Sequence, residues 1–150
     1  MDTVYKLVEK YVQKYPRGIY WHRLKKHADI VERHLNPGEE VIYAFAGQKN
    51  NSVLDIFSTS VIALTNKRIL IGQKRVVFGY FLTSITPDLF NDLSVYQGLT
   101  FGKITIDTVK EEVFITNLDK RALPEIETSI TSFMMEAKQK YAQELRSKEE

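Results

Sequence analysis

Cysteine is absent from the 150 residues of this sequence. Without thiols, the chain forms no disulfide bond, no thiolate nucleophile, no iron–sulfur cluster and no thiolate zinc site. The same absence is compatible with a reducing compartment. We therefore expect a cytoplasmic protein whose function does not depend on sulfur chemistry.

Long hydrophobic runs are missing as well. The longest apolar stretch, residues 53–64, is interrupted by Asp55 and by hydroxyl side chains, whereas a membrane-spanning helix needs roughly twenty apolar residues. The N-terminus does not show the charged leader, apolar run and small-residue cleavage site of a secretory signal. We expect neither a transmembrane helix nor a signal peptide, so that any membrane contact is peripheral.

The chain also has little net charge. It is formally +2 at pH 7, with 27% charged and 43% hydrophobic residues. This composition predicts one folded domain of ordinary size rather than a disordered chain. Residues 1–34 are net basic, whereas residues 111–150 are net acidic. A nearly neutral chain disfavours nucleic acid as the main partner.

Motifs of common enzyme families are absent. The sequence contains no G-x-S-x-G elbow, no G-x-x-x-x-G-K-[ST] phosphate loop and no H-E-x-x-H helix. Its carboxylates are scattered, and the adjacent pairs fall at strand edges, turns or the C-terminus. We predict no catalytic residue, no cofactor and no enzymatic activity.

Three histidines, His22, His27 and His34, all fall within one predicted helix. His27 and His34 lie on the same helical face but about 10 Å apart along the axis. A metal ion needs ligands about 2 Å away, so these two cannot chelate together. We predict surface or interface histidines and no metal site.

Two amphipathic helices are predicted at the N-terminus. Apolar residues recur every three or four positions over residues 2–15 and again over residues 20–34. A proline and a glycine separate the two segments, and an Asn-Pro-Gly turn ends the second. Residues 1–35 are therefore interpreted as a helical hairpin, which either packs on the rest of the chain or forms an independent arm.

After the second helix the pattern changes to that of short strands. Residues 61–65 and 68–71 flank Asn66 and Lys67. Because asparagine tolerates positive φ, this pair predicts a two-residue hairpin. A last amphipathic helix is predicted over residues 121–146, with its start fixed by a proline in the first turn. Further strands are predicted at residues 41–46, 75–82, 94–97, 103–106 and 113–117.

Seven strands followed by one C-terminal helix is the order of the pleckstrin-homology (PH) fold. Residues 35–42 (LNPGEEVI) resemble the entry to the first strand of bacterial PH-like and GRAM-like domains, and residues 63–70 (ALTNKRIL) resemble their L-T-N-K-R hairpin. Residues 78–81 (FGYF) and 102–106 (GKITI) resemble two later strands. The resemblance covers about residues 35–140.

This resemblance implies an α+β fold, a partly open seven-stranded antiparallel barrel capped by the C-terminal helix. The predicted organisation is a helical hairpin at 1–35, a PH-like domain at 36–146 and a frayed tail at 147–150. The resemblance also implies a binding module, since some family members bind phosphoinositides or peptides and bacterial relatives tend to assemble into rings. Between its first two strands this chain offers only Lys49 in place of the basic cluster of a phosphoinositide binder.

Four basic residues form the candidate ligand site. Lys67 and Arg68 fall at the start of one predicted strand and Lys74 and Arg75 near the start of the next, which could place four positive charges at the ends of neighbouring strands. Together they could receive a phosphate or an acidic peptide. The alternative is a polar hairpin with edge-strand charges that discourage pairing between sheets.

The N-terminal helices carry a candidate interface or membrane surface. Aromatic residues beside basic ones are typical of helices at membrane interfaces. Such a stripe is alternatively buried against its own body or a neighbouring subunit. The residues in question are Tyr11, Tyr15, Trp21, Arg23, Lys25 and Lys26.

These observations predict a non-enzymatic binding or scaffolding module. Its expected partner is a protein, and the two apolar helix faces indicate a homo-oligomer. The alternative is peripheral binding to an anionic membrane surface through the basic, aromatic N-terminal helices. The sequence identifies neither the partner nor the number of subunits.

Overall fold

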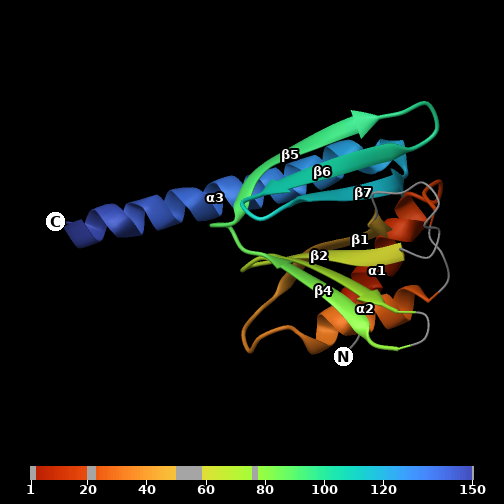
Figure 1. Ribbon diagram of the computed structural model, residues 1–150, viewed down its shortest axis with the longest axis horizontal. Helices are drawn as coiled ribbons and strands as arrows, with labels where there is room; N and C mark the ends of the chain where they lie inside the picture. The colour runs from red at the N-terminus through yellow and green to blue at the C-terminus, as the bar shows by residue number, and fades with distance from the viewer. Residues whose placement is uncertain (1–2, 20–22, 50–58, 76–77, 150) are drawn as a thin grey trace.

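The computed structural model describes residues 3–19, 23–49, 59–75 and 78–149. Two N-terminal helices precede seven strands, and one long helix ends the chain (Figure 1). The elements are α1 (Thr3–Lys14), α2 (Leu24–Arg33), β1 (Val41–Lys49), β2 (Thr59–Thr65), β3 (Ile69–Lys74), β4 (Tyr80–Ile85), β5 (Phe90–Gln97), β6 (Gly102–Thr108), β7 (Glu112–Leu118), the 3-10 turn η1 (Lys120–Ala122) and α3 (Leu123–Glu149).

The seven strands form one antiparallel sheet in the order β4-β3-β2-β1-β7-β6-β5. Strand β1 pairs with β2 along its length, but with β7 only at Gln48 and Lys49. This narrow seam joins the two halves of the sheet, and no described residues pair the edge strands β4 and β5. The predicted partly open seven-stranded antiparallel barrel with a C-terminal helix is therefore confirmed.

The inner core lies between the two halves of the sheet and α3. Phe45 on β1 and Ile106 on β6 are fully buried there. Helix α3 contributes Ile126, Ile130 and Met134, all at 0% exposure. Their spacing of four residues puts them on one helical face, which is why this part of α3 stays on the sheet.

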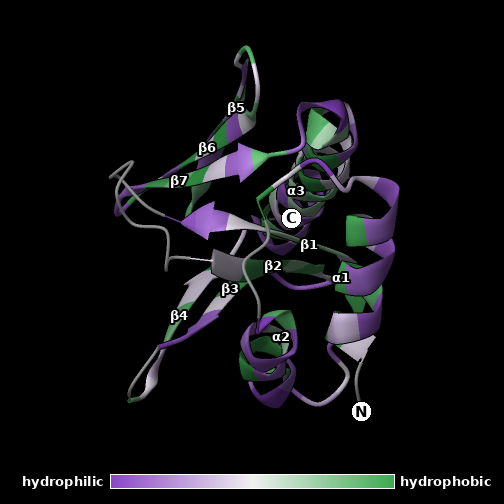
Figure 2. Cartoon of the chain, turned by 90° about the vertical axis from the view of Figure 1, so that its right-hand side faces the viewer, coloured by the Kyte–Doolittle hydropathy of each residue, from purple (hydrophilic) through white to green (hydrophobic). Residues whose placement is uncertain are grey.

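Helices α1 and α2 cover the other face of β1–β3 (Figure 2). Val8 of α1 and Val31 of α2 are fully buried against that face. Strand β2 is consequently buried at all seven positions, because both of its faces are covered. The N-terminal hairpin is therefore packed on the barrel and is not an independent arm.

Small side chains allow this close packing. Ala44 and Ala46 lie under the helices. At Gly72 on β3, a Cβ atom would lie 2.8 Å from Cγ2 of Val31 and 3.2 Å from the carbonyl oxygen of His27. Glycine is required at this position by the approach of α2 to the strand.

The second helix begins later than predicted. Helix α2 starts at Leu24, whereas the periodicity indicated a start at Tyr20, which lies outside the described residues. Arg23 has a φ of 81°, in the left-handed region, and this residue cannot continue a right-handed helix. Apolar spacing alone does not reveal such a reversal of the backbone.

The strand predicted over residues 75–82 begins later among the described residues, and residues 76 and 77 lie outside them. The backbone N–H of Arg75 donates to the carbonyl of Gly79 over 3.1 Å, which places these residues in the β3–β4 turn. Strand β4 begins at Tyr80 and continues to Ile85. Gly79 has a φ of 73°, a conformation that ends the extended pattern.

The predicted hairpin at Asn66 and Lys67 is confirmed, but the reason given for it is wrong. Among the described non-glycine residues only Arg23 and Asn117 have positive φ. Instead, Oγ1 of Thr65 accepts hydrogen bonds from the backbone N–H groups of Lys67 and Arg68, each over 3.0 Å. The loop is thus closed by a threonine side chain.

Helix α3 is longer than predicted. Its second residue is Pro124, as expected, because a proline is tolerated in the first turn. The helix continues to Glu149, so residues 147–149 of the predicted tail are helical. The C-terminal part of α3 leaves the body of the molecule and projects from it (Figure 1). We call this part, residues 139–149, the rod. No helix of the described segments is both long and apolar enough to cross a membrane.

Candidate functional site

The four predicted ligand-binding cations do not form one cluster. Lys67 and Arg68 precede β3, whereas Lys74 ends that strand and Arg75 follows it. Arg68 and Lys74 are therefore separated by roughly 20 Å at about 3.3 Å per residue. The structure divides the predicted site into two pairs at opposite ends of β3.

Arg68 is held in a structural ion pair. Its Nε and Nη2 atoms donate to the two carboxylate oxygens of Glu39, each over 3.0 Å, and Nη2 also donates to the carbonyl of His34. The Glu39 side chain is only 1% exposed. Lys67, by contrast, is exposed. Of this pair, only Lys67 is directed freely to solvent.

The environment of Glu39 keeps it charged. Burial by itself would raise the pKa of the carboxyl, but hydrogen bonds from Arg68, from the backbone N–H of Asn36 and from Thr65 outweigh that effect. Together they lower the pKa of Glu39 to about 2. The carboxylate is therefore a permanent acceptor for Arg68 at neutral pH.

The other pair lies where β3 ends and β4 begins, and the β5–β6 hairpin turns on the same side of the molecule (Figure 1). We call this side the hairpin end and define it by Arg75, Phe78, Phe81, Tyr96, Leu99 and Lys103. Phe78 is 80% exposed and Phe81 is 55% exposed, with the Arg75 guanidinium 5.2 Å from the Phe81 ring. On the second hairpin Leu99 is 93% and Tyr96 65% exposed. The hairpin end thus combines exposed apolar side chains with basic ones.

The described aromatic residues of the predicted N-terminal surface, Tyr11 and Tyr15, are not exposed. Tyr11 is 3% exposed and packs edge-on against the ring of Tyr43, with ring centroids 6.4 Å apart. Tyr15 is half-buried, with its ring centroid 5.4 Å from that of Tyr11. This stripe packs against its own body, the alternative that the sequence left open. Trp21 lies outside the described residues.

The predicted basic residues beside this stripe have ordinary surface environments. Lys25 and Lys26 are exposed, and Arg23 is half-buried. The Nζ atom of Lys25 lies 3.2 Å from a carboxylate oxygen of Asp29, one helical turn away. Such an exposed pair contributes little to stability.

The histidines are distributed differently from the prediction. His27 is only 4% exposed, and its Nδ1 accepts the backbone N–H of Lys74 over 2.8 Å, so the expectation of a surface histidine is wrong here. His34 lies 3.1 Å through Nε2 from the hydroxyl of Tyr80. His22 lies outside the described residues. Within those residues no three potential ligands gather for a metal ion.

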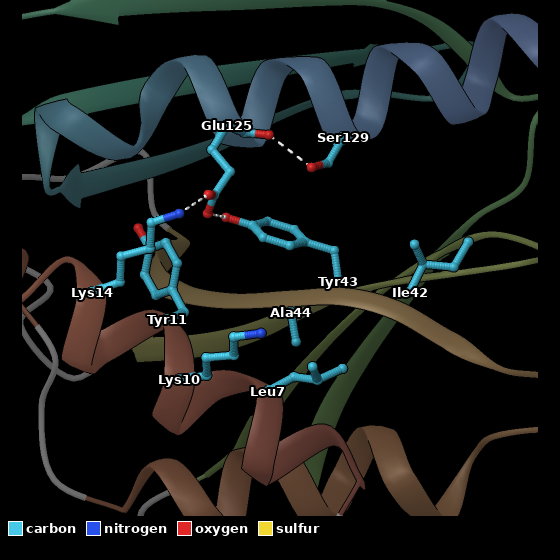
Figure 3. A pocket seen from close by; sticks show the side chains of 9 residues that line it. All are labelled: Leu7, Lys10, Tyr11, Lys14, Ile42, Tyr43, Ala44, Glu125 and Ser129. Atoms are coloured by element: carbon cyan, nitrogen blue, oxygen red, sulfur yellow. Dashed lines mark hydrogen bonds and ion pairs between the residues drawn. The ribbon is translucent and has the colours of Figure 1, made fainter.

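A pocket of about 300 Å³ lies where α1, β1 and α3 meet (Figure 3). Glu125 at the start of α3 accepts a hydrogen bond from Nζ of Lys14 over 2.5 Å. Its second oxygen accepts the hydroxyl of Tyr43 over 2.8 Å. These three side chains come from three different elements, and both carboxylate oxygens are engaged.

The charges of this pocket are fixed near neutral pH. Burial would raise the pKa of Glu125, but the bonds from Lys14 and Tyr43 lower it overall. The hydrogen bond to Glu125 in turn raises the pKa of Lys14. Sequence analysis missed this site because Lys14 and Glu125 are 111 residues apart and belong to no local motif.

The projecting part of α3 is a further exposed surface. Its apolar stripe is fully buried as far as Met134 and then continues into solvent, with Tyr141 62% and Leu145 45% exposed. All residues from 138 to 149 are exposed. The base of the rod borders a groove of about 750 Å³ that is lined by Pro87, Asp88, Ala137, Lys138 and Tyr141.

The sequence model of the bacterial PH domain matches residues 35–132. The chain belongs to the bacterial PH domain family. The match confirms the resemblance carried by residues 35–42 and 63–70. None of the curated proteins matches the sequence.

Two solved PH domains are similar in structure. A pleckstrin homology domain from Shewanella amazonensis SB2B is 16% identical, with a TM-score of 0.48, over 77% of this chain and 91% of that one. A DUF1696 family protein with a pleckstrin-homology domain from Shewanella loihica PV-4 is 13% identical, with a TM-score of 0.47, over 76% of this chain and 99% of that one.

The surfaces of this bacterial PH domain divide according to the family match. The hairpin end and β1 fall within residues 35–132, whereas α1, α2 and the rod of α3 fall outside. The pocket is therefore built partly by the domain, through Tyr43 and Glu125, and partly by the N-terminal helix, through Lys14.

Proposed function

We propose that this bacterial PH domain is a non-enzymatic binding module that self-associates through the rod of α3, a use that leaves its other surfaces for a protein partner. The observation that carries the proposal is the apolar stripe of α3, which is buried on the body and continues exposed beyond it. The family match supports a binding module, because PH-like domains generally mediate binding.

A partner would cover the apolar side of the rod. Residues 139–149 extend for about 16 Å at 1.5 Å per residue, and all of them are exposed. Tyr141 and Leu145 are one turn apart and therefore lie on the same side. A second helix against that side would cover both.

The apolar side of the rod is complementary to itself, which favours a second copy of the same chain. An antiparallel pairing centred on Tyr141 brings Leu145 of the second copy level with Ala137, which lines the groove at the base of the rod. Ala137, Tyr141 and Leu145 are spaced by four residues and therefore lie on one helical side. Each copy would thus cover the exposed Tyr141 and Leu145 of the other.

A charge placed on the apolar side of the rod, combined with sedimentation velocity, tests the proposal. We expect the full chain to form a dimer whose dissociation constant rises at least about tenfold in Leu145→Asp, because the substitution buries a charge in the helix pairing. The matched control Gln143→Asp introduces the same side chain at an exposed position on the opposite side of the rod, and it leaves the dimer unchanged.

Two results would remove self-association through the rod. One is a monomer over a wide concentration range. The other is a dimer that is equally weakened by Leu145→Asp and Gln143→Asp, since that would point to net charge rather than to a specific helix pairing.

Non-enzymatic function is supported by the chemistry of the pocket. Glu125 is its carboxylate, and both oxygens of that group carry hydrogen bonds. Its pKa is lowered, whereas a general acid at neutral pH needs a raised one.

A second candidate function is peripheral binding to an anionic membrane, favoured by the hairpin end. The hairpin end takes the place of the N-terminal helices as the candidate membrane-binding surface, because Tyr11 of those helices is buried. Apolar side chains of the two hairpin tips would enter the headgroup region while Arg75 and Lys103 face anionic lipids. We expect salt-sensitive co-sedimentation with phosphatidylserine vesicles that is lost in Phe78→Ser/Leu99→Ser. Absence of binding at low salt contradicts this candidate.

A further inference from the structure

We propose that the pocket between α1, β1 and α3 binds a small amphipathic carboxylate, with its anionic head beside the lysines of α1 and its apolar body over β1. This binding site is separate from the rod of α3, and it does not depend on self-association.

The pocket has an excess of positive charge. Lys10 and Lys14 contribute two cations, and Glu125 contributes one anion. Glu125 is already engaged by Lys14 and by Tyr43. Lys10 has no ion-pair partner among the described residues, and Figure 3 shows its amine directed into the space between α1 and β1. One negative charge would therefore balance the site.

The remaining wall of the pocket is apolar. Leu7 and Ile42 lie at the end away from Lys14 and Glu125 (Figure 3). Ile42 is 53% exposed, whereas most residues of β1 are buried. This is a large exposed fraction for an aliphatic side chain on a strand. An apolar ligand body lying over Ile42 would remove this surface from water.

The shape of the pocket selects for a small ligand. A volume of about 300 Å³ is at the lower limit of ordinary ligand pockets. The polar and apolar ends are arranged along one direction, so a linear molecule with one charged end fits both. Both cations of the site, Lys10 and Lys14, belong to α1, outside the family match of residues 35–132. The ligand would thus lie across the junction between the N-terminal helix and the domain.

Amide NMR titration of the full chain with three six-carbon probes tests the inference. Hexanoate, 1-hexanol and hexylammonium share one apolar body and differ in head charge. We expect hexanoate to shift the amides of Leu7, Ala44 and Ser129, which line the pocket. Hexanol should bind about tenfold more weakly because it lacks the charge-assisted hydrogen bond, and hexylammonium should not bind.

Variants of α1 provide the matched control. Lys10→Gln should weaken hexanoate binding at least about fivefold while leaving hexanol binding unchanged. Lys6→Gln removes an exposed lysine of the same helix that does not line the pocket, and it should change neither. Equal affinity for hexanoate and hexanol, shifts confined to another part of the chain, or wild-type hexanoate affinity in Lys10→Gln would each overturn the inference. The dimer measured by sedimentation is unaffected by any of these results.

Discussion

Arg68 donates two hydrogen bonds to the carboxylate of Glu39, one to each oxygen and each over 3.0 Å. Planar, bidentate pairs of this kind are the strongest ion pairs between side chains. The pair joins the segment before β1 to the β2–β3 hairpin. Asn66 adds a second link, because its Oδ1 accepts the backbone N–H of Glu40 over 3.0 Å. The L-T-N-K-R segment thus has a structural role, because it holds the β2–β3 hairpin to the segment before β1.

Removing Arg68 should therefore destabilise the fold. Arg68→Ala leaves the Glu39 carboxylate, 1% exposed, without its charged partner, and we expect the free energy of unfolding to fall by about 3 kcal/mol. Lys67→Ala, at the exposed neighbouring position, should stay within about 0.5 kcal/mol of the parent. Urea unfolding measures both. Equal stability of the two variants would show that the pair contributes nothing.

Acid should destabilise the fold by protonating Glu39 and Asp119. The hydrogen bond from Arg121 lowers the pKa of Asp119 to about 2, and the pKa of Glu39 is also about 2. Both values lie below those of the unfolded chain, so the stabilisation is complete above about pH 5 and is lost as the pH falls towards 2.

Urea unfolding between pH 7 and pH 2.5 measures this loss. The dependence should be shallower in Glu39→Gln, which has no carboxylate to protonate at this position. A slope identical to that of the parent protein would remove Glu39 from the acid response.

The N-terminal helices should be essential to the body. Val8→Asp places a charge at a position of 0% exposure between α1 and the sheet, and we expect a loss of at least about 3 kcal/mol. The control Lys6→Asp introduces the same side chain at an exposed position two residues earlier, and it should retain nearly all of the stability. Thermal unfolding separates the two outcomes. Similar melting temperatures would mean that α1 detaches without cost.

The junction at the pocket should depend on one hydroxyl. Tyr43→Phe removes the donor to Glu125, and the free energy of unfolding should fall by about 1 kcal/mol. Tyr141→Phe, on the exposed rod, should leave the stability of the monomer unchanged. Chemical unfolding at low protein concentration measures this difference. An unchanged stability of Tyr43→Phe would show that water replaces the bond.

Local periodicity predicted the order of elements well, because helix and strand faces repeat every few residues. It placed α1 and the hairpin at Asn66 correctly. It missed the reversal at Arg23, since a single left-handed residue leaves the apolar spacing unchanged. It also grouped Lys67 with Lys74, because the two are close in sequence. The length of β3 separates them in the structure.

Contacts between distant segments were beyond such reasoning. The pocket unites Lys14 with Glu125 across 111 residues, and only the packing of α1 on the finished sheet brings them together. The buried position of Tyr11 follows from the same packing. An aromatic residue on an amphipathic stripe looks alike in sequence whether its own domain, a membrane or a partner covers it.

The hairpin end and the C-terminus of α3 lie at opposite ends of the molecule (Figure 1). Two copies joined antiparallel along their rods would therefore direct their hairpin ends away from each other. Such a dimer is bivalent, and it could bridge two separate surfaces or two copies of one target. Even weak contacts at each hairpin end would then combine into strong attachment, because the second contact forms within an already tethered complex.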